Sequence, residues 1–232
     1  MDLYEHNPDE SRRFFAFDMF GTLVRSRQRD MDDLFRVFYG FFPEQAPERI
    51  QEEYEVFCKV FELTHEPNSE YTIPMLIDHL NWVFGTDIDS LDAEERMMRG
   101  TKMFLTIDGV KDTLGYFKER GYKIGVLSNT TYRSSVVRGV LEDNGISDLV
   151  DSVVTSAEIG YKKPDPRAYD AVLRSLGAER SDCYFAGDSK VNDYCGPYGF
   201  GMKRVFLIDP CGDCGRRTTV SSISEIPSLF RD

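Results

Sequence analysis

FFAFDMFGTLV, residues 14–24, joins a short apolar run to a polar turn, and the rest of the chain can be interpreted outward from it. Its first four residues are all apolar, which is typical of a strand buried on both faces of a parallel sheet. Asp18 follows at once, and Gly21 allows the backbone to turn. The stretch therefore predicts a buried strand that delivers a carboxylate to one edge of a sheet.

The chain after residue 109 alternates between two apolar patterns. Helical spacing predicts helices near 110–117, 136–141 and 169–176, each followed by a glycine that can end it. Short apolar runs predict strands near 124–127, 153–154, 183–186 and 205–208. Alternating strands and helices indicate an α/β fold with a doubly wound, mostly parallel sheet.

Residues 30–105 differ from the rest of the chain in pattern and charge. Apolar residues at helical spacing predict four helices there. The segment carries 17 acidic and 6 basic residues, and so nearly all of the chain's excess negative charge. It interrupts the sheet after the first strand. We expect a separate helical module over 30–105 and a sheet domain formed by 1–29 and 106–232.

The composition excludes several classes of protein. With 28 basic and 40 acidic residues, the net charge is −12, which argues against nucleic acid as a ligand. No apolar run approaches the roughly 18 residues that cross a bilayer. The acidic start MDLYEHNPDE is unlike a leader peptide. We expect a cytoplasmic monomer or homodimer that acts on a small molecule and binds no membrane.

The five cysteines are expected to be free thiols in a reducing compartment. They are Cys58, Cys183, Cys195, Cys211 and Cys214. The last two form a CxxC pair, but no second close pair or nearby histidine completes a zinc site.

Polar groups follow four of the predicted strands, where ligands bind in doubly wound sheets. The first strand is followed by Asp18, the second by Ser128-Asn129, the third by Lys162-Lys163, and the fourth by Asp188 and Asp193. An aspartate can attack phosphorus or carbon to form a covalent intermediate. Ser128, Asn129 and backbone donors near Thr22 can bind the transferring group, and Lys163 (or Lys162) supplies positive charge. Asp18, Asp188 and Asp193 offer the oxygen ligands that Mg²⁺ prefers.

Four segments together resemble the haloacid dehalogenase-like (HAD) hydrolase superfamily. They are FFAFDMFGTLV, YKIGVLSNT, SAEIGYKKPDPRAY and CYFAGDSKVNDYCGPYGFGM, and they cover about residues 13 to 208. The resemblance implies a Rossmann-like core with a helical cap inserted between the first two motifs, which fits residues 30–105. It implies Asp18 as nucleophile, Ser128 as phosphate binder, Lys163 as charge stabiliser, and Asp188 as a metal ligand supported by Asp193.

The chain departs from the phosphatases of this superfamily at Phe20. They carry a second aspartate at this position, which protonates the leaving alkoxide and later activates water. Phe20 cannot move a proton, and general acid–base help is typically worth 10²–10⁴-fold. Its backbone carbonyl, a Mg²⁺ ligand in the superfamily, is retained.

An aromatic residue at this position is similar to the L-2-haloacid dehalogenases, in which a carboxylate displaces halide without an acid or a metal. KPDPRAY, residues 163–169, also resembles that branch. A dehalogenase would need an arginine over the site for the substrate carboxylate, for which Arg49 in the cap or Arg25, Arg27 and Arg29 at the hinge are candidates.

Asp188 separates the two interpretations, because dehalogenases have a neutral residue in its place. Without a metal, this extra carboxylate would raise the pKa of the nucleophile, whereas Mg²⁺ would offset it. We therefore expect a Mg²⁺-dependent phosphatase acting on a small phosphorylated metabolite, either one with a good leaving group or one whose leaving group takes a proton from the cap, water or the substrate. Dehalogenation is the alternative. A second alternative is a catalytically weak domain that binds a partner through its acidic cap and the aromatic segment 37–43 (VFYGFFP).

Overall fold

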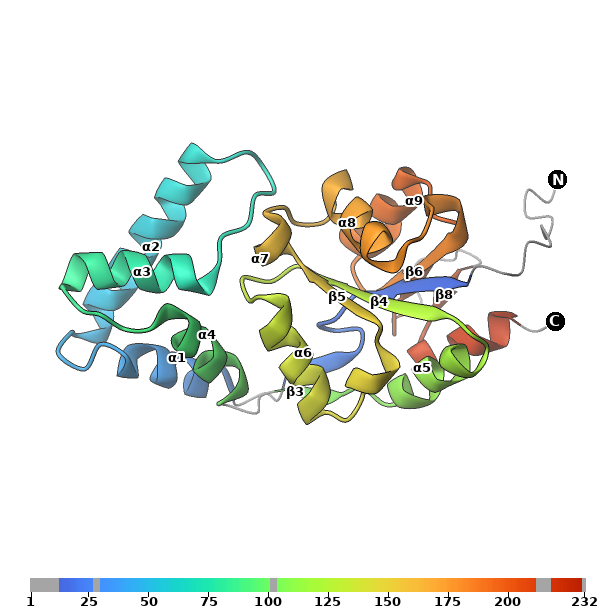
Figure 1. The fold of residues 1–232 in the computed structure, drawn as a ribbon, viewed down its shortest axis with the longest axis horizontal. Coiled ribbons are helices and arrows are strands. Elements are labelled where there is room, and N and C mark those ends of the chain that lie inside the picture. The colour runs from blue at the N-terminus through green and yellow to red at the C-terminus, as the bar shows by residue number, and fades with distance from the viewer. Residues whose placement is uncertain (1–12, 27–29, 101–103, 212–217, 231–232) are drawn as a thin grey trace.

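A computed structural model describes residues 13–26, 30–100, 104–211 and 218–230 (Figure 1). Within these ranges one sheet has six strands in the order β5-β4-β1-β6-β7-β8, and all neighbours run parallel. The fold is therefore the expected doubly wound α/β type. The strands of this sheet are β1 (Phe14–Phe17), β4 (Lys123–Ser128), β5 (Ser152–Thr155), β6 (Cys183–Gly187), β7 (Arg204–Ile208) and β8 (Thr219–Val220).

Helices cover both faces of the sheet because β1 is apolar on both sides. Phe15 and Phe17 pack into the apolar cluster that includes α5, α6 and the C-terminal 3₁₀ helix, while Phe14 and Ala16 pack into the cluster that includes α8. This alternation follows from the two-residue repeat of a strand. The helices are α5 (Val110–Glu119), α6 (Ser134–Asp143), α8 (Pro166–Leu176), α9 (Gly196–Phe200) and the 3₁₀ helix Ile223–Phe230.

Shorter elements connect the strands. A helix of one turn, α7 (Ser156–Ile159), and a π-helical turn over Lys190–Cys195 follow β5 and β6, respectively. Two 3₁₀ turns lie over Ser147–Leu149 and Arg180–Asp182. The sequence patterns did not predict β8, α7 or the π-helical turn, because such short elements carry almost no periodicity.

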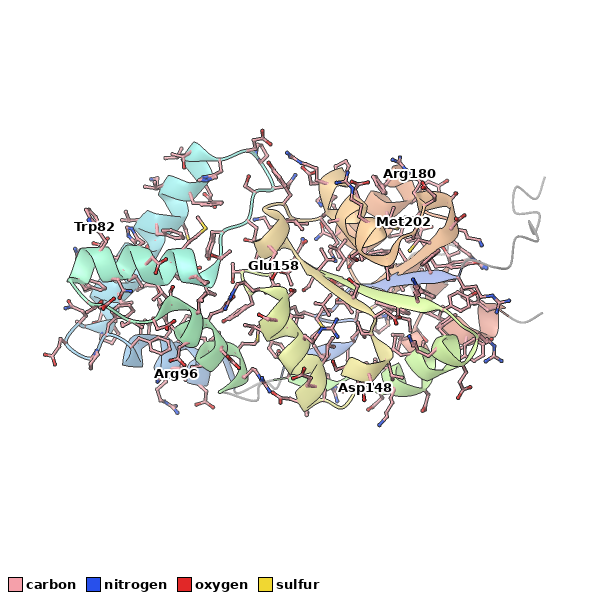
Figure 2. The ribbon with its side chains drawn as sticks, viewed as in Figure 1. Trp82, Arg96, Asp148, Glu158, Arg180 and Met202 are labelled. Atoms are coloured by element: carbon pink, nitrogen blue, oxygen red, sulfur yellow. The ribbon has the colours of Figure 1, made fainter. Side chains whose placement is uncertain are left out.

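In the sequence, four helices separate β1 from the other strands of the sheet, as the helical spacing of apolar residues in 30–105 predicts. They are α1 (Asp30–Gly40), α2 (Pro47–Thr64), α3 (Ile73–Phe84) and α4 (Ser90–Arg99). They lie together to one side of the sheet domain (Figure 1), and Trp82 on α3 projects away from that domain (Figure 2). Pro47 begins α2, and Gly85 ends α3 with φ 66°, positions that these residues favour.

A two-stranded antiparallel ribbon joins these helices to the sheet domain. It pairs β2 (Val24–Ser26), just after the first motif, with β3 (Phe104–Thr106), with Val24 opposite Thr106. The segment therefore enters and leaves through neighbouring strands. The predicted boundaries of the helical segment lie close to the ribbon, but the ribbon itself was not predicted, because each strand has only three residues.

The four helices also contact the sheet domain directly. Glu94 of α4 is fully buried, and its carboxylate accepts hydrogen bonds from the backbone N–H and the guanidinium of Arg133 at the start of α6. The linker between α2 and α3 pairs with the segment before α8: the Lys162 N–H donates to the Asn68 carbonyl at 2.7 Å, and Ser69 forms a β-bridge with Tyr161. This linker therefore contacts the segment that carries Lys163.

The aromatic segment 37–43 is not the binding surface that one alternative supposed. Phe38, Phe41 and Phe42 are buried in the apolar cluster that α1–α4 share with the sheet domain. An aromatic run of this kind can equally be core, and here Phe38 at the end of α1 and Phe41 and Phe42 just after that helix are buried.

The remaining sequence expectations concern membranes and thiols. In the described ranges, no helix combines the length and apolarity that crossing a bilayer needs. Cys58, Cys183, Cys195 and Cys211 are free thiols, as expected. Cys214 lies outside the described residues, so the CxxC pair is not described as a unit.

Candidate active site

Three neighbouring strands end at the same edge of the sheet and deliver polar residues there. Strand β1 pairs with β4 and β6, with Phe17 opposite both Val126 and Ala186. Asp18 directly follows β1, and its backbone N–H donates to the carbonyl of Ala186 at 2.9 Å. Ser128 ends β4, and Asp188 follows β6. The parallel register therefore brings three distant motifs to one edge, as the sequence predicted.

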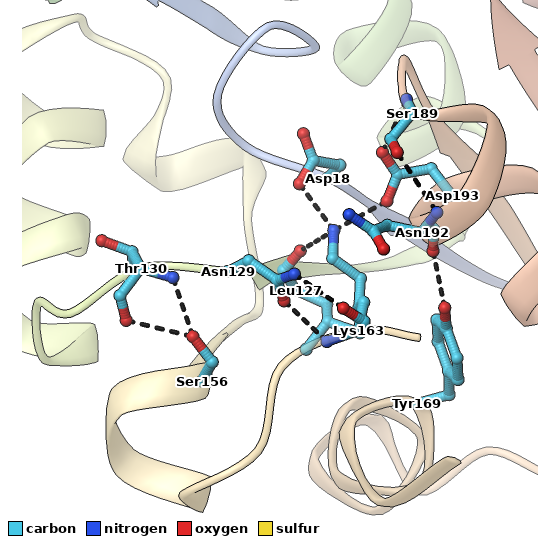
Figure 3. Close-up of polar contacts among 10 residues, drawn as sticks. All are labelled: Asp18, Leu127, Asn129, Thr130, Ser156, Lys163, Tyr169, Ser189, Asn192 and Asp193. Carbon is cyan, nitrogen blue, oxygen red and sulfur yellow. Dashed lines mark hydrogen bonds and ion pairs between the residues drawn. The ribbon is translucent and has the colours of Figure 1, made fainter. Parts of the chain in front are cut away.

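Lys163 connects the acidic residues of this edge. Its ammonium group donates to Asp18 Oδ1 at 2.6 Å, to Asp193 Oδ1 at 2.7 Å and to the Leu127 carbonyl at 3.0 Å (Figure 3). The residue is only 3% exposed. All three donor positions of the ammonium are therefore occupied, which fixes its charge beside Asp18. The Leu127 carbonyl has no sequence signal, because it is a backbone group.

Asn129 holds the Lys163 loop rather than pointing to a ligand. Its Nδ2 donates to the Lys163 carbonyl at 2.9 Å, and its Oδ1 accepts from the Lys163 N–H at 2.7 Å (Figure 3). From its place after a strand, this amide was expected to bind the transferring group. The structure instead makes Asn129 a positioning residue that clamps the backbone of the catalytic candidate Lys163.

Asp188 and Asp193 approach Asp18 from the segment after β6. One carboxylate oxygen of each of the three residues lies within 4.8 Å of the others. Two glycines make this approach possible: a Cβ on Gly21 would lie 2.3 Å from Asp188 Oδ2, and a Cβ on Gly187 would lie 2.5 Å from Asp193 Cβ. A larger side chain at either position would push a carboxylate out of the group.

The charges in this group are unevenly balanced. Burial raises the pKa of Asp193 to about 6, and the charge of Asp18 adds to this, although Lys163 opposes both effects. Asp188 is exposed as a residue, but partial burial of its carboxylate and the charge of Asp18 raise its pKa as well. Burial by itself would lower the pKa of Lys163, but the charges of Asp18 and Asp193 outweigh it and raise that pKa. Three carboxylates therefore share a single ammonium.

Three buried hydroxyl groups at this edge lack a hydrogen-bond partner among the described residues. They are the Oγ of Ser128, the Oγ1 of Thr155 opposite it at the end of β5, and the Oγ1 of Thr22, which is 1% exposed. A buried hydroxyl is usually paired. Ser128 is therefore a candidate to donate to a bound ligand. The N–H of Thr22 is already used within the turn, where it bonds the Met19 carbonyl.

Phe20 occupies the position at which a proton donor for the leaving oxygen would be expected. Its ring packs on that of Phe104 in β3, with ring centroids 4.8 Å apart. Among the described residues its backbone carbonyl accepts no hydrogen bond. The side chain thus belongs to the wall beside the carboxylates, and the carbonyl is available to a ligand.

The arginine candidates are not all near this edge. Arg49 lies on α2, where its guanidinium pairs with Glu52 and Glu53 of the same helix, and it does not line the cavity next to the carboxylates. The structure thus does not bring Arg49 to the site, because same-helix acids satisfy its charge. Arg25 does line that cavity, whereas Arg27 and Arg29 lie outside the described residues.

Together, the doubly wound sheet and its carboxylate–lysine edge define a Rossmann-like hydrolase with a candidate aspartate nucleophile. The chain matches the family model of the haloacid dehalogenase-like hydrolases over residues 13–194. It belongs to this family, as the four motifs indicated.

Relatives within the family are named for different activities. Phosphatase MT3486 of Mycobacterium tuberculosis (strain CDC 1551 / Oshkosh) is 38% identical over 113 residues, which cover 49% of this chain and 50% of the relative. (S)-2-haloacid dehalogenase 1 of Pseudomonas sp. (strain CBS-3) is 25% identical over 147 residues, covering 62% of this chain and 64% of the relative. The matched regions thus span about half to two thirds of these relatives, which include both a phosphatase and a dehalogenase.

A solved structure extends the likeness over nearly the whole chain. The HAD phosphatase from Thermococcus onnurineus superposes with a TM-score of 0.64 at 20% identity, covering 94% of this chain and 97% of that one. At this identity the likeness shows the fold alone.

Proposed function

We propose that the protein is a Mg²⁺-dependent phosphatase that acts on a small phosphorylated metabolite in the cytoplasm, with Asp18 as nucleophile and α1–α4 as its cap. The observation that carries this proposal is the group of Asp18, Asp188 and Asp193 around Lys163. A dehalogenating site needs no third carboxylate, whereas a phosphatase site with a divalent cation does. The phosphatase relative supports the same class of reaction.

The donor set fits a magnesium ion. Asp18 keeps one carboxylate oxygen free of Lys163, Asp188 is exposed, and the Phe20 carbonyl is available. Oxygen ligands of this kind are those that Mg²⁺ binds. Both oxygens of Asp193 already accept hydrogen bonds, from Lys163 and from the Ser189 N–H at 3.0 Å. We therefore assign Asp18, the Phe20 carbonyl and Asp188 as ligands and Asp193 as their support.

The reaction proceeds in two steps on the residues of this chain. A carboxylate oxygen of Asp18 forms a bond to phosphorus, the bond from phosphorus to the leaving oxygen breaks, and its electron pair goes to that oxygen. Water then hydrolyses the aspartyl phosphate, which restores the carboxylate and releases phosphate. Ser128 donates a hydrogen bond to the phosphoryl group, and Lys163 holds positive charge beside it. When bound, Mg²⁺ would neutralise negative charge on the phosphoryl oxygens.

Chelation separates the two hydrolase activities. We expect EDTA to abolish release of phosphate from phenyl phosphate, and excess Mg²⁺ to restore it, because three carboxylates and a phosphate cannot share one ammonium. Release of chloride from 2-chloropropionate, measured in parallel, should be absent with and without metal. Phosphate release that survives EDTA would contradict the metal assignment, and metal-independent chloride release would favour the dehalogenase instead.

Replacing Phe20 by Asp is expected to raise kcat for an alkyl phosphate such as glycerol 2-phosphate by about tenfold to hundredfold, because a proton donor then faces the leaving oxygen. Phe20→Leu is the matched control, since it changes the shape of the wall without adding an acid. Steady-state kinetics with both variants measures the effect. An equal change in both variants, or no gain with Asp, would count against the role assigned to this position.

A further inference from the structure

A cavity of about 490 Å³ adjoins the carboxylate group. It lies among the β2–β3 ribbon, α1, α4 and the segment after β4, and it begins at Phe20 and Gly21. Gly21 also contacts the carboxylate of Asp188, as the 2.3 Å approach to its absent Cβ shows. The cavity therefore starts where a phosphoryl group would bind, and it can hold the part of a substrate that leaves.

The walls of this cavity are mostly apolar and aromatic. The rings of Phe20 and Phe104 pack together on one side, and Thr130 and Ser26 add hydroxyl groups. Such walls suit a flat apolar body rather than a sugar, whose hydroxyl groups would lose their hydrogen bonds to water there. The other apolar residues of the wall are Val24, Leu34, Met98 and Tyr132.

Arg25 is the single charged residue among the described residues that line the cavity. Within the described part of the chain, its guanidinium forms no hydrogen bond or ion pair. Three other arginines, by contrast, pair with an acid: Arg99 with Asp143, Arg133 with Glu94, and Arg167 with Asp165. An unpaired guanidinium at the mouth of an apolar cavity is suited to an anion on the ligand.

We propose that this cavity binds the leaving group of the substrate, that the leaving group is a flat apolar phenol-like or enol-like alcohol, and that Arg25 recognises one anionic group on it. The anion is a carboxylate or a second phosphate. This inference rests on the proposed phosphatase function and specifies its substrate class.

The missing proton donor supports the same substrate class. Phosphorus binds Asp18 while the bond to the leaving oxygen breaks, and that oxygen departs with the electron pair. A phenolic oxygen has a pKa of about 10, far below that of water. A phenol-like leaving group therefore departs as an anion without an acid at position 20, and water later supplies its proton.

The test compares four phosphate esters in the presence of Mg²⁺: phenyl phosphate, 3-carboxyphenyl phosphate, 1,3-phenylene bisphosphate and glycerol 2-phosphate. We expect kcat/KM for one of the two anionic aryl esters to exceed that for phenyl phosphate by about tenfold, the value of an exposed charge-assisted hydrogen bond. Glycerol 2-phosphate should be the poorest substrate. The preferred anionic ester identifies the anion.

Arg25→Gln should bring the ratio of the preferred anionic ester to phenyl phosphate close to one, and Arg25→Lys should restore part of it. Arg36→Gln is the matched control, because Arg36 lies on α1, pairs with Asp33 and is 76% exposed. That variant should keep the wild-type ratio. A ratio that Arg25→Gln leaves unchanged, or glycerol 2-phosphate as the best substrate, overturns the inference while the phosphatase function stands.

A binding measurement separates failure of the subsite from failure of the phosphatase function. Titration calorimetry would measure the affinity of 3-hydroxybenzoate, the product of the carboxylated ester, for wild-type protein and Arg25→Gln. Weaker binding of 3-hydroxybenzoate by Arg25→Gln than by wild-type protein supports the subsite, even if no phosphate ester is hydrolysed. Absence of hydrolysis together with such binding would reject only the phosphatase function. If the protein shows no turnover of any phosphate ester and no Arg25-dependent binding, both the subsite and the phosphatase function are overturned.

Discussion

Asp18→Asn is expected to lower kcat for phenyl phosphate by about 10⁴-fold or more, because the amide cannot form the covalent intermediate. Asn still offers an oxygen to the Lys163 ammonium, which now donates to Asp18 at 2.6 Å and to Asp193 at 2.7 Å. The variant should therefore fold. Initial-rate assays and a thermal melt, run on the same preparation, measure both properties.

The same substitution separates an enzyme from a binding domain. A matched control is Asp170→Asn on α8, where the carboxylate pairs with Arg174 at the surface, and it should keep full turnover. A catalytically weak domain would retain its affinity for a ligand in both variants and would show no turnover to lose. Turnover at the wild-type rate in Asp18→Asn would show that Asp18 is not the nucleophile.

Lys163→Met is expected to lower the free energy of unfolding by about 3–5 kcal/mol at neutral pH, because it leaves the carboxylates of Asp18 and Asp193 buried without a counter-charge. Asp18 is 7% exposed and Asp193 is 1% exposed, so water replaces little of the lost interaction. Turnover should also fall by about 10²–10³-fold, because the positive charge next to the nucleophile is lost. Chemical denaturation and initial rates measure the two effects.

The stability loss in Lys163→Met should depend on pH in a defined direction. Burial raises the pKa of Asp193 to about 6 even with Lys163 present, and removal of the ammonium raises it further. A carboxyl group whose folded-state pKa is raised destabilises the fold when ionised, and protonation relieves this. The loss should therefore be smaller at pH 5 than at pH 8. Lys162→Met, which removes the neighbouring ammonium, should show neither the large loss nor this pH dependence.

Much of the site could be predicted because its residues follow buried strands. The apolar runs before Asp18, Ser128 and Asp188 are strong sequence signals, and a parallel sheet brings such strand ends to one edge. Two roles could not be predicted in this way. Asn129 has the same residue type whether it binds a ligand or clamps a loop, and only the partners of its amide, both on Lys163, decide between them.

Which arginine could bind an anion on the ligand also could not be predicted from residue type. Arg49 and Arg25 are equally good anion binders as residue types. The first has acids within reach on its own helix, Glu52 and Glu53, whereas the second lies on a three-residue strand that lines the cavity. The pairing of Arg49 is local, because Glu52 and Glu53 follow it by three and four residues on one helix. The cavity beside Arg25 arises from tertiary contacts, which no local pattern encodes.

The α/β class, the four inserted helices and the order of the polar strand ends could be predicted from residue patterns, because strand and helix periodicity and residue type are local properties. Three further features required the folded chain: Lys163 bridges Asp18 and Asp193; Phe38, Phe41 and Phe42 are core; and Arg25 lines a cavity beside Phe20. These features depend on contacts between segments that are distant in the sequence, and such contacts follow from the packing of the whole chain.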